Sequence, residues 1–184
     1  MARKSEKPNY PQGWGMSGSK PAHYEAGIDR SVFHCGTQSA YMKHAVDKPE
    51  GFGTLMQQFA ADNYLGKRMQ LQLWIKTEDV QGWVAPWMRV DGKAGANKPL
   101  SFDNMCERQI TGSTDWAKIR IVLDVPEDSE NLAFGIMLGR QGKLWFDDVT
   151  FEVVGKEVPA TDCPCSGRRV APRNLNFEGD DAEF

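Results

Sequence analysis

The chain has 184 residues, of which 40% are hydrophobic and 26% are charged, which is enough to build one domain of ordinary size around a core. Its 22 Lys and Arg nearly balance 25 Asp and Glu, giving a formal net charge of −3, and no long basic block occurs, so direct binding to nucleic acid is not expected. No apolar run approaches the roughly 20 residues that span a bilayer, and no secretion signal is recognisable, which predicts a cytoplasmic protein that binds no membrane.

In chain order, residues 1–20 are rich in Gly, Pro, Ser and Lys and are expected to be loosely ordered, apart from Trp14. From Tyr24 onward, short runs with a period of two alternate with turn residues, which is typical of β-strands. The expected strands are residues 39–44, 53–59, 68–76, 83–90, 100–105, 116–125, 132–138 and 144–154. They predict an all-β fold, a two-sheet antiparallel β-sandwich of the jelly-roll kind, over residues 21–158. A linker over 159–173 and a tail over 174–184 follow it.

Two of these runs predict a recognition surface on the outer side of the sheets. In 68–76 the aliphatic residues alternate with Gln70, Gln72 and Trp74, so Trp74 points away from the core. In 83–91 the aliphatic residues alternate in the same way and face the core, which leaves Trp83, Trp87, Arg89 and Asp91 on the outer face. We therefore expect a ligand-binding surface that combines aromatic rings with polar groups. Its residues are Trp74, Trp87, Arg89, Asp103, Asn104, Arg108 and Gln58.

Each group in this surface also has a structural interpretation that the sequence leaves open. Large aromatic residues fill small cores as readily as they bind ligands. Asp103 and Asn104 together accept and donate hydrogen bonds, as a vicinal diol requires, but the same pair favours turns. Arg89 and Asp103 are also candidates for an ion pair with each other.

The order of several sequence blocks resembles the carbohydrate-binding-module-like, or galactose-binding-like, jelly-roll domains. These blocks are YEAGID (24–29), SAYMK (39–43), GFGTLMQQF (51–59) and LWFDDVTF (144–151). More narrowly, WMRVDG (87–92) and FDNM (102–105) resemble a bacterial subgroup found alone or appended to AraC-type transcription regulators. The resemblance covers residues 14–158 and implies the fold more specifically than a function, because this fold hosts sugar binders, protein binders and structural modules alike.

The segment NLNFE, Asn174–Glu178, has the pattern of a strand and departs from the family, in which a similar motif opens the first strand of the module. Either it supplies a missing edge strand, within the chain or to a neighbouring copy as a homo-oligomer, or it begins a second module. We favour strand supply, because an unpaired sheet edge promotes association.

The resemblance also implies a structural calcium held between the last strand and the NxxFE-type strand. The candidate ligands here are Asp147, Asp148 and Glu178, although calcium requires six to eight oxygen ligands and this set is incomplete. No other cofactor is expected. The four cysteines (Cys35, Cys106, Cys163 and Cys165) are expected to stay reduced.

These observations favour a non-catalytic module that binds carbohydrate or a similar polyhydroxy ligand. The alternative is a protein-interaction or regulatory module, associated with a transcription regulator, that associates through its sheet edge or C-terminal strand. A glycoside hydrolase is a weaker alternative, because no pair of carboxylates is fixed at a catalytic separation. The sequence shows neither a nucleophile elbow nor a phosphate loop.

Overall fold

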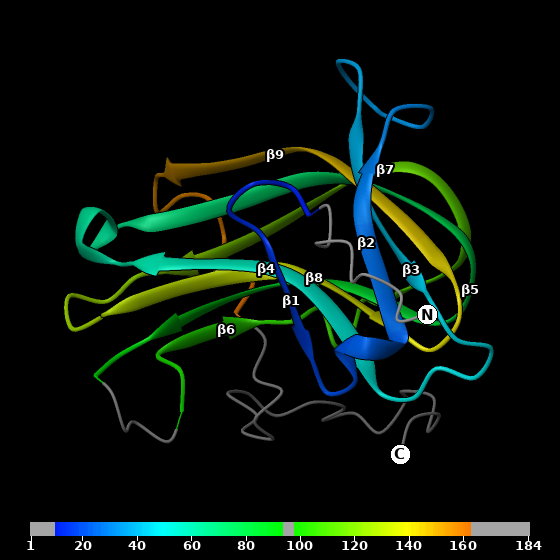
Figure 1. The fold of residues 1–184 in the computed structure, drawn as a ribbon. Helices are drawn as coiled ribbons and strands as arrows, with labels where there is room; N and C mark the ends of the chain where they lie inside the picture. The colour runs from blue at the N-terminus through cyan, green and yellow to red at the C-terminus, as the bar shows by residue number, and fades with distance from the viewer. Residues whose placement is uncertain (1–9, 94–97, 163–184) are drawn as a thin grey trace, which may run out of the picture.

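A computed structural model describes residues 10–93 and 98–162, and within them the chain is an antiparallel β-structure (Figure 1). Two single-turn 3-10 helices, η1 (Pro21–His23) and η2 (Asp62–Tyr64), accompany the strands. The strands are β1 (Gly15–Gly18), β2 (Tyr24–Asp29), β3 (Ser39–His44), β4 (Phe52–Ala60), β5 (Arg68–Asp91), β6 (Ser101–Asp103), β7 (Ile110–Asp124), β8 (Asn131–Gly139) and β9 (Lys143–Val154). The predicted all-β, two-sheet antiparallel sandwich is confirmed.

Strand β5 belongs to both layers of the sandwich. Its first half, residues 68–78, pairs with β7 and β9, whereas its second half, residues 83–91, pairs with β8 and β6. One layer therefore runs β7-β5-β9-β3-β2 and the other β6-β5-β8-β4-β1. The sequence predicted two separate strands here. They are one strand because the intervening residues keep pairing, Val80 with Gly112 among them.

The change of layer coincides with an irregularity in β5 that shifts its inward phase by one residue. Asp79 has a positive φ of 49°, and the register against β7 slips on either side of Val80. Before this point Leu73 and Ile75 face the core, and after it Val84 and the even-numbered residues that follow do so. The even-numbered side chains therefore point outward in the first half of β5. In the second half the odd-numbered side chains do so.

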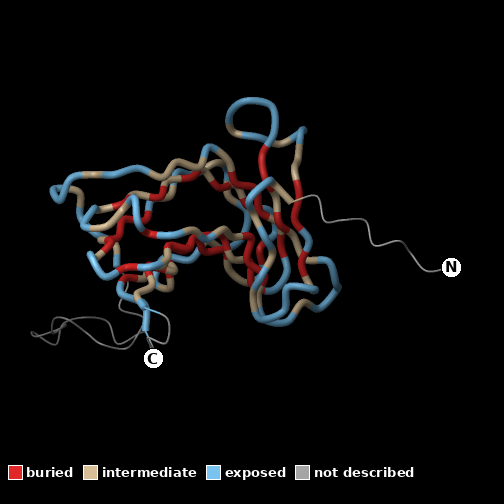
Figure 2. Tube along the Cα trace, turned by 60° about the vertical axis from the view of Figure 1, so that its left-hand side comes forward, coloured by how far each residue is buried: buried red, intermediate tan, exposed pale blue. Residues whose placement is uncertain are grey.

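The core lies between the two layers and follows the predicted alternation (Figure 2). On β8 the large side chains at every second position point into the core and are buried: Leu132, Phe134, Ile136 and Leu138. Burial of an aliphatic or aromatic side chain of this size contributes about 1.5–3 kcal/mol, so these layers are the main source of stability. Among the described residues no helix is long and apolar enough to cross a membrane.

Both ends of the described chain are attached to the sandwich. Residues 15–18, expected to be loose, form β1 on the edge of β4, and Trp14 packs against Phe134 and Phe146 at ring-centroid distances of 5.6 and 5.3 Å. After β9 the chain returns along the sheet, where Thr161 donates its N–H to the Val122 carbonyl at 2.7 Å. Ordered contacts therefore extend from Trp14 to at least Thr161.

The expectation that all four cysteines are reduced is wrong for Cys106, which is disulfide-bonded. Cys35 is a free and exposed thiol. Cys163 and Cys165 lie outside the described residues.

Close approach of β4 to β8 generates a stability prediction. A Cβ on Gly135 would lie 2.5 Å from the Leu55 carbonyl oxygen, whereas a Cβ on Gly15 would have open space around it. We expect Gly135→Ala to lower the free energy of unfolding by about 1–3 kcal/mol, because the two strands would have to separate. Gly15→Ala, the matched control, should change it by less than about 0.5 kcal/mol. Urea denaturation measures both, and equal midpoints would contradict the strand packing described here.

Candidate ligand-binding groove

A groove of about 700 Å³ lies on the outer side of the layer that contains β4, β8 and the second half of β5. It forms there because alternate residues of these strands point outward, and small residues on β8 leave room between larger neighbours. The groove is lined by Ser17, Gly18, Phe52, Thr54, Met56, Gln58, Trp83, Trp87, Arg89, Phe102, Asn104, Gln109 and Met137. Four of the predicted ligand-binding residues, Gln58, Trp87, Arg89 and Asn104, are thus brought together.

Aromatic side chains provide much of the groove's apolar surface. Trp87 is only 7% exposed, and its indole N–H donates to the Thr54 hydroxyl oxygen at 2.8 Å. That hydroxyl donates in turn to the Ile136 carbonyl at 3.1 Å, which fixes the ring in one orientation. Trp83 is more exposed and lies over Gly139, where an added Cβ would come within 2.5 Å of the indole. Trp87 is therefore a fixed floor, and Trp83 offers the more accessible ring.

Polar groups surround these rings. Arg89 places its guanidinium carbon 6.0 Å from the centre of the Trp87 ring and pairs with Asp91 through a 3.0 Å contact between Nε and Oδ2. Gln58 and Gln109 are exposed on the groove lining, and the Asn104 side chain accepts the N–H of Cys106 at 3.2 Å. The groove thus combines aromatic rings with amide and guanidinium groups.

A second hollow of about 770 Å³ adjoins the groove and shares Phe52 and Trp83 with it. Its other lining residues include Glu50 and Gln141. Behind it, the Tyr24 hydroxyl donates to the Gly51 carbonyl at 2.9 Å and accepts the N–H of Arg140 at 3.0 Å, which ties two loops together. Burial raises the pKa of Tyr24, so this hydroxyl keeps its proton at neutral pH.

Trp74 does not belong to the groove, which corrects the expectation of one continuous surface. It projects from the first half of β5, on the outer side of the other layer, and its ring stacks on His34 at a centroid distance of 4.0 Å and an interplanar angle of 16°. The Lys118 ammonium lies 5.2 Å from the same ring. Trp74 and Trp87 are separated because β5 changes layer between them. The outward-facing residues of its two halves therefore lie on opposite sides of the sandwich.

Asp103 and Arg108 are also absent from the groove lining. The Asp103 side chain is fully buried, accepts the N–H of Met105 at 2.8 Å and forms an ion pair with Arg108. Arg108 also donates to the Arg120 carbonyl at 3.3 Å. The pairing of Arg89 with Asp103, left open by the sequence, does not occur, since Arg89 pairs with Asp91. These contacts favour the structural interpretation of Asp103.

The candidate calcium ligands are only partly described. Asp147 accepts three backbone N–H groups, those of His34 at 2.9 Å and Cys35 at 3.0 Å on one oxygen and that of Asp148 at 2.8 Å on the other. No cluster of three or more His, Cys, Asp or Glu suited to a metal exists within residues 10–93 and 98–162. Glu178 lies outside those ranges. The calcium site stays a prediction, and the described role of Asp147 is to hold the loop before β3.

Sequence reasoning missed several groove residues. Trp83 was placed on the correct outer face but left out of the predicted set, although it is the more exposed tryptophan. Phe52 had a usable signal, since it stands in phase with Thr54 and Gln58 on the same strand. Phe102 and Gln109 had none, because β6 has three residues and a loop follows it.

Comparison with known proteins gives one relative and a set of similar folds. No protein-family model matches the chain. The chain is 47% identical over 169 residues to a protein of Bacillus subtilis (strain 168) named as the uncharacterized HTH-type transcriptional regulator YbfP. The match takes in 91% of this chain but only 57% of that regulator's length.

Among solved structures, the chain resembles the CBM22-1 xylan-binding domain of Paenibacillus barcinonensis Xyn10C, with a TM-score of 0.53, 12% identity, and coverage of 79% of this chain and 88% of that domain. It also resembles TmCBM61, solved with β-1,4-galactotriose, at a TM-score of 0.50 and 16% identity. That match covers 83% of this chain and 100% of TmCBM61. The chain also resembles the enzymatically active domain of the bacteriophage CBA120 tailspike protein 4, with a TM-score of 0.59 and 12% sequence identity. This match covers 78% of this chain and 20% of the tailspike chain. At these identities the likenesses show the β-sandwich fold alone.

The two arginine–aspartate pairs provide a matched stability test. Arg89 and Arg108 have the same side-chain exposure, 41%, but the Asp91 partner is 29% exposed whereas the Asp103 partner is fully buried. Arg108→Ala should lower the free energy of unfolding by about 2–3 kcal/mol, because it leaves a buried carboxylate without its cation. Arg89→Ala should cost less than about 1 kcal/mol. Denaturation midpoints that reverse this order would contradict the structural role of Asp103.

Proposed function

We propose that the chain is a non-catalytic binding module whose groove takes a carbohydrate or a similar polyhydroxy ligand. The observation that carries this proposal is the convergence of Trp83 and Trp87 with Gln58, Arg89 and Asn104 on one lining. A sugar ring has an apolar C–H face and a rim of hydroxyls, so it requires aromatic and hydrogen-bonding groups side by side. A volume of about 700 Å³ lies within the range of small-molecule sites.

Within this proposal the residues have distinct tasks. Trp83 presents an accessible ring for stacking against the C–H face of the ligand, and Trp87 with Met137 forms an apolar floor. The amides of Gln58 and Asn104 both donate and accept hydrogen bonds, and the Arg89 guanidinium donates them, which suits pairs of neighbouring hydroxyls. Because Arg89 is already held by Asp91, less conformational freedom is lost when a ligand binds.

The composition of the groove supports binding without catalysis. Hydrolysis of a glycosidic bond ordinarily uses two carboxyl groups on either side of that bond. No Asp or Glu belongs to the groove lining found in the described part of the chain, where the polar side chains are amides, hydroxyls and one guanidinium. The hydrolase alternative is therefore not favoured by this groove.

A regulatory role is the second candidate, and the relative named as an HTH-type transcriptional regulator favours it. We propose that the chain corresponds to a ligand-sensing or interaction module of such a regulator, in line with the resemblance to domains appended to AraC-type proteins. The two candidates are compatible, because a sensor that controls transcription must first bind its signal. A polyhydroxy ligand in the groove would then be the signal.

Two tryptophans on opposite sides of the sandwich make the binding proposal testable. The protein would be screened on a glycan array that includes xylan fragments and β-1,4-galactotriose, and any glycan that binds would be titrated by calorimetry. Trp83→Ala should weaken binding at least about tenfold, equivalent to about 1.4 kcal/mol, because the stacking surface is lost. Trp74→Ala should leave the affinity within about twofold.

Thermal melting of both variants provides the control for folding. The binding proposal is wrong if no glycan on the array binds, and its location is wrong if Trp74→Ala, but not Trp83→Ala, weakens binding.

A further inference from the structure

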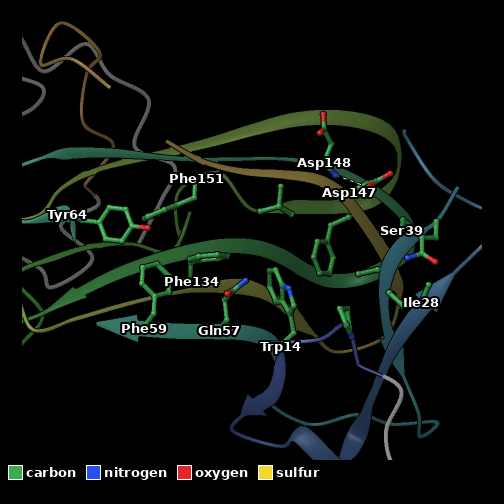
Figure 3. A pocket seen from close by; sticks show the side chains of 15 residues that line it. Trp14, Ile28, Ser39, Gln57, Phe59, Tyr64, Phe134, Asp147, Asp148 and Phe151 are labelled. Atoms are coloured by element: carbon green, nitrogen blue, oxygen red, sulfur yellow. Dashed lines mark hydrogen bonds between the residues drawn. The ribbon is translucent and has the colours of Figure 1, made fainter. Parts of the chain in front are cut away.

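A second cleft, of about 660 Å³, lies between β4 and β9 and is separate from the ligand-binding groove (Figure 3). Its lining shares no residue with that of the groove. Both layers of the sandwich contribute to it, with Phe59 from β4 and Phe134 from β8 on one side and Phe151 from β9 on the other. The cleft is therefore an opening between the layers, next to the core.

Aromatic rings form most of the wall of this cleft. Phe134, which is 5% exposed, stacks on Phe151 at a centroid distance of 5.6 Å. Phe59 and Tyr64 meet Phe151 edge-on at centroid distances of 5.6 and 5.3 Å. Of the five lining rings other than Phe146, four are only partly buried, those of Trp14, Phe59, Tyr64 and Phe151. A ligand that covers these rings removes apolar surface from water, which is favourable.

Three polar groups point into the cleft among these rings. Figure 3 shows the Gln57 amide, the Trp14 indole and the Tyr64 hydroxyl directed toward its interior. No hydrogen bond joins these three side-chain groups to another residue that the structure describes. The indole N–H can donate, and the amide and the hydroxyl can both donate and accept. A mostly apolar pocket on which a few polar groups converge has the usual composition of a small-molecule site.

Charged side chains contribute little to the interior of the cleft. Within the described part of the chain, its lining includes Asp147 and Asp148 but no Lys, Arg or His. Both carboxylate oxygens of Asp147 already accept backbone N–H groups, and the Asp148 side chain points away from the cleft in Figure 3. A charged ligand would lose its hydration here without gaining a partner of opposite charge. The cleft therefore favours an uncharged ligand.

We propose that this cleft binds an uncharged small molecule that is mainly aromatic and carries at least one hydrogen-bonding group. The flat rings of such a ligand pack against Phe59, Tyr64 and Phe151, in the same geometries that these residues adopt with one another. Its polar group bonds to the Gln57 amide or to the Trp14 N–H. A volume of about 660 Å³ lies within the range of small-molecule sites. The proposal does not depend on a glycan in the groove, because the two linings are separate.

A pair of fluorescent probes tests the proposal on the full-length protein. N-phenyl-1-naphthylamine is uncharged and consists of two aromatic ring systems joined by an N–H, whereas 8-anilino-1-naphthalenesulfonate has the same framework with an added sulfonate. The uncharged probe should bind at one site per chain with a Kd in the micromolar range, on the order of −8 kcal/mol. The sulfonate should bind at least about tenfold more weakly, because the cleft provides no cation for it.

Two neighbouring glutamines locate the bound probe. Gln57 lines the cleft and Gln58 lines the groove, because successive side chains of a strand point to opposite faces. Gln57→Glu should weaken binding of the uncharged probe at least about tenfold, since the probe would remove the new carboxylate from water. Gln58→Glu should leave the affinity for this probe within about twofold. Thermal melting of both variants checks that they are folded.

Three results would overturn the proposal. The first is the absence of saturable binding of the uncharged probe to the wild type, as expected if another part of the chain fills the cleft. The second is equal or tighter binding of the sulfonate. The third is an effect of Gln58→Glu as large as that of Gln57→Glu, which would place the probe in the groove. No glycan takes part in these measurements, so their failure is distinct from a failure of the proposed function.

Discussion

The architecture depends on one long strand that belongs to both layers. Because β5 runs without a break from Arg68 to Asp91, the two layers share a continuous backbone and the core is enclosed between its halves. The irregularity at Asp79 shifts the inward phase by one residue as the strand changes layer. That shift decides which side chains meet solvent on each side of the molecule, and it places Trp83, Trp87 and Arg89 together.

The fold could be predicted from the sequence because alternation is a local property. The aliphatic residues of β8 and of the first half of β5 lie inside as their spacing indicates, and Trp87 and Arg89 share an outer face as expected. The grouping of Trp74 with Trp87 could not be predicted, because phase within a strand says nothing about which layer that strand occupies. Likewise, the burial of Asp103 depends on Arg108 and on a loop whose course the local pattern does not specify.

The groove and the cleft between β4 and β9 lie on different parts of the sandwich and have different linings. The groove offers fixed aromatic rings and hydrogen-bonding side chains, which suit a small polyhydroxy molecule. The cleft between β4 and β9 is lined mostly by aromatic and aliphatic side chains, among them Trp14, Phe59 and Phe151. Phe134 of β8 lines the cleft and Met137, three residues further along the same strand, lines the groove, so one strand contributes to both. This arrangement is compatible with the relative's description as a transcriptional regulator.

The proposed groove is tested most directly by following the indole N–H signals of the six tryptophans by NMR while a glycan selected on the array is added. If the ligand binds in the groove, the signals of Trp83 and Trp87 shift on binding, while that of Trp74 keeps its position. Shifts of Trp74 without any change at Trp83 and Trp87 would place the ligand on the opposite side of the sandwich and contradict the proposed groove.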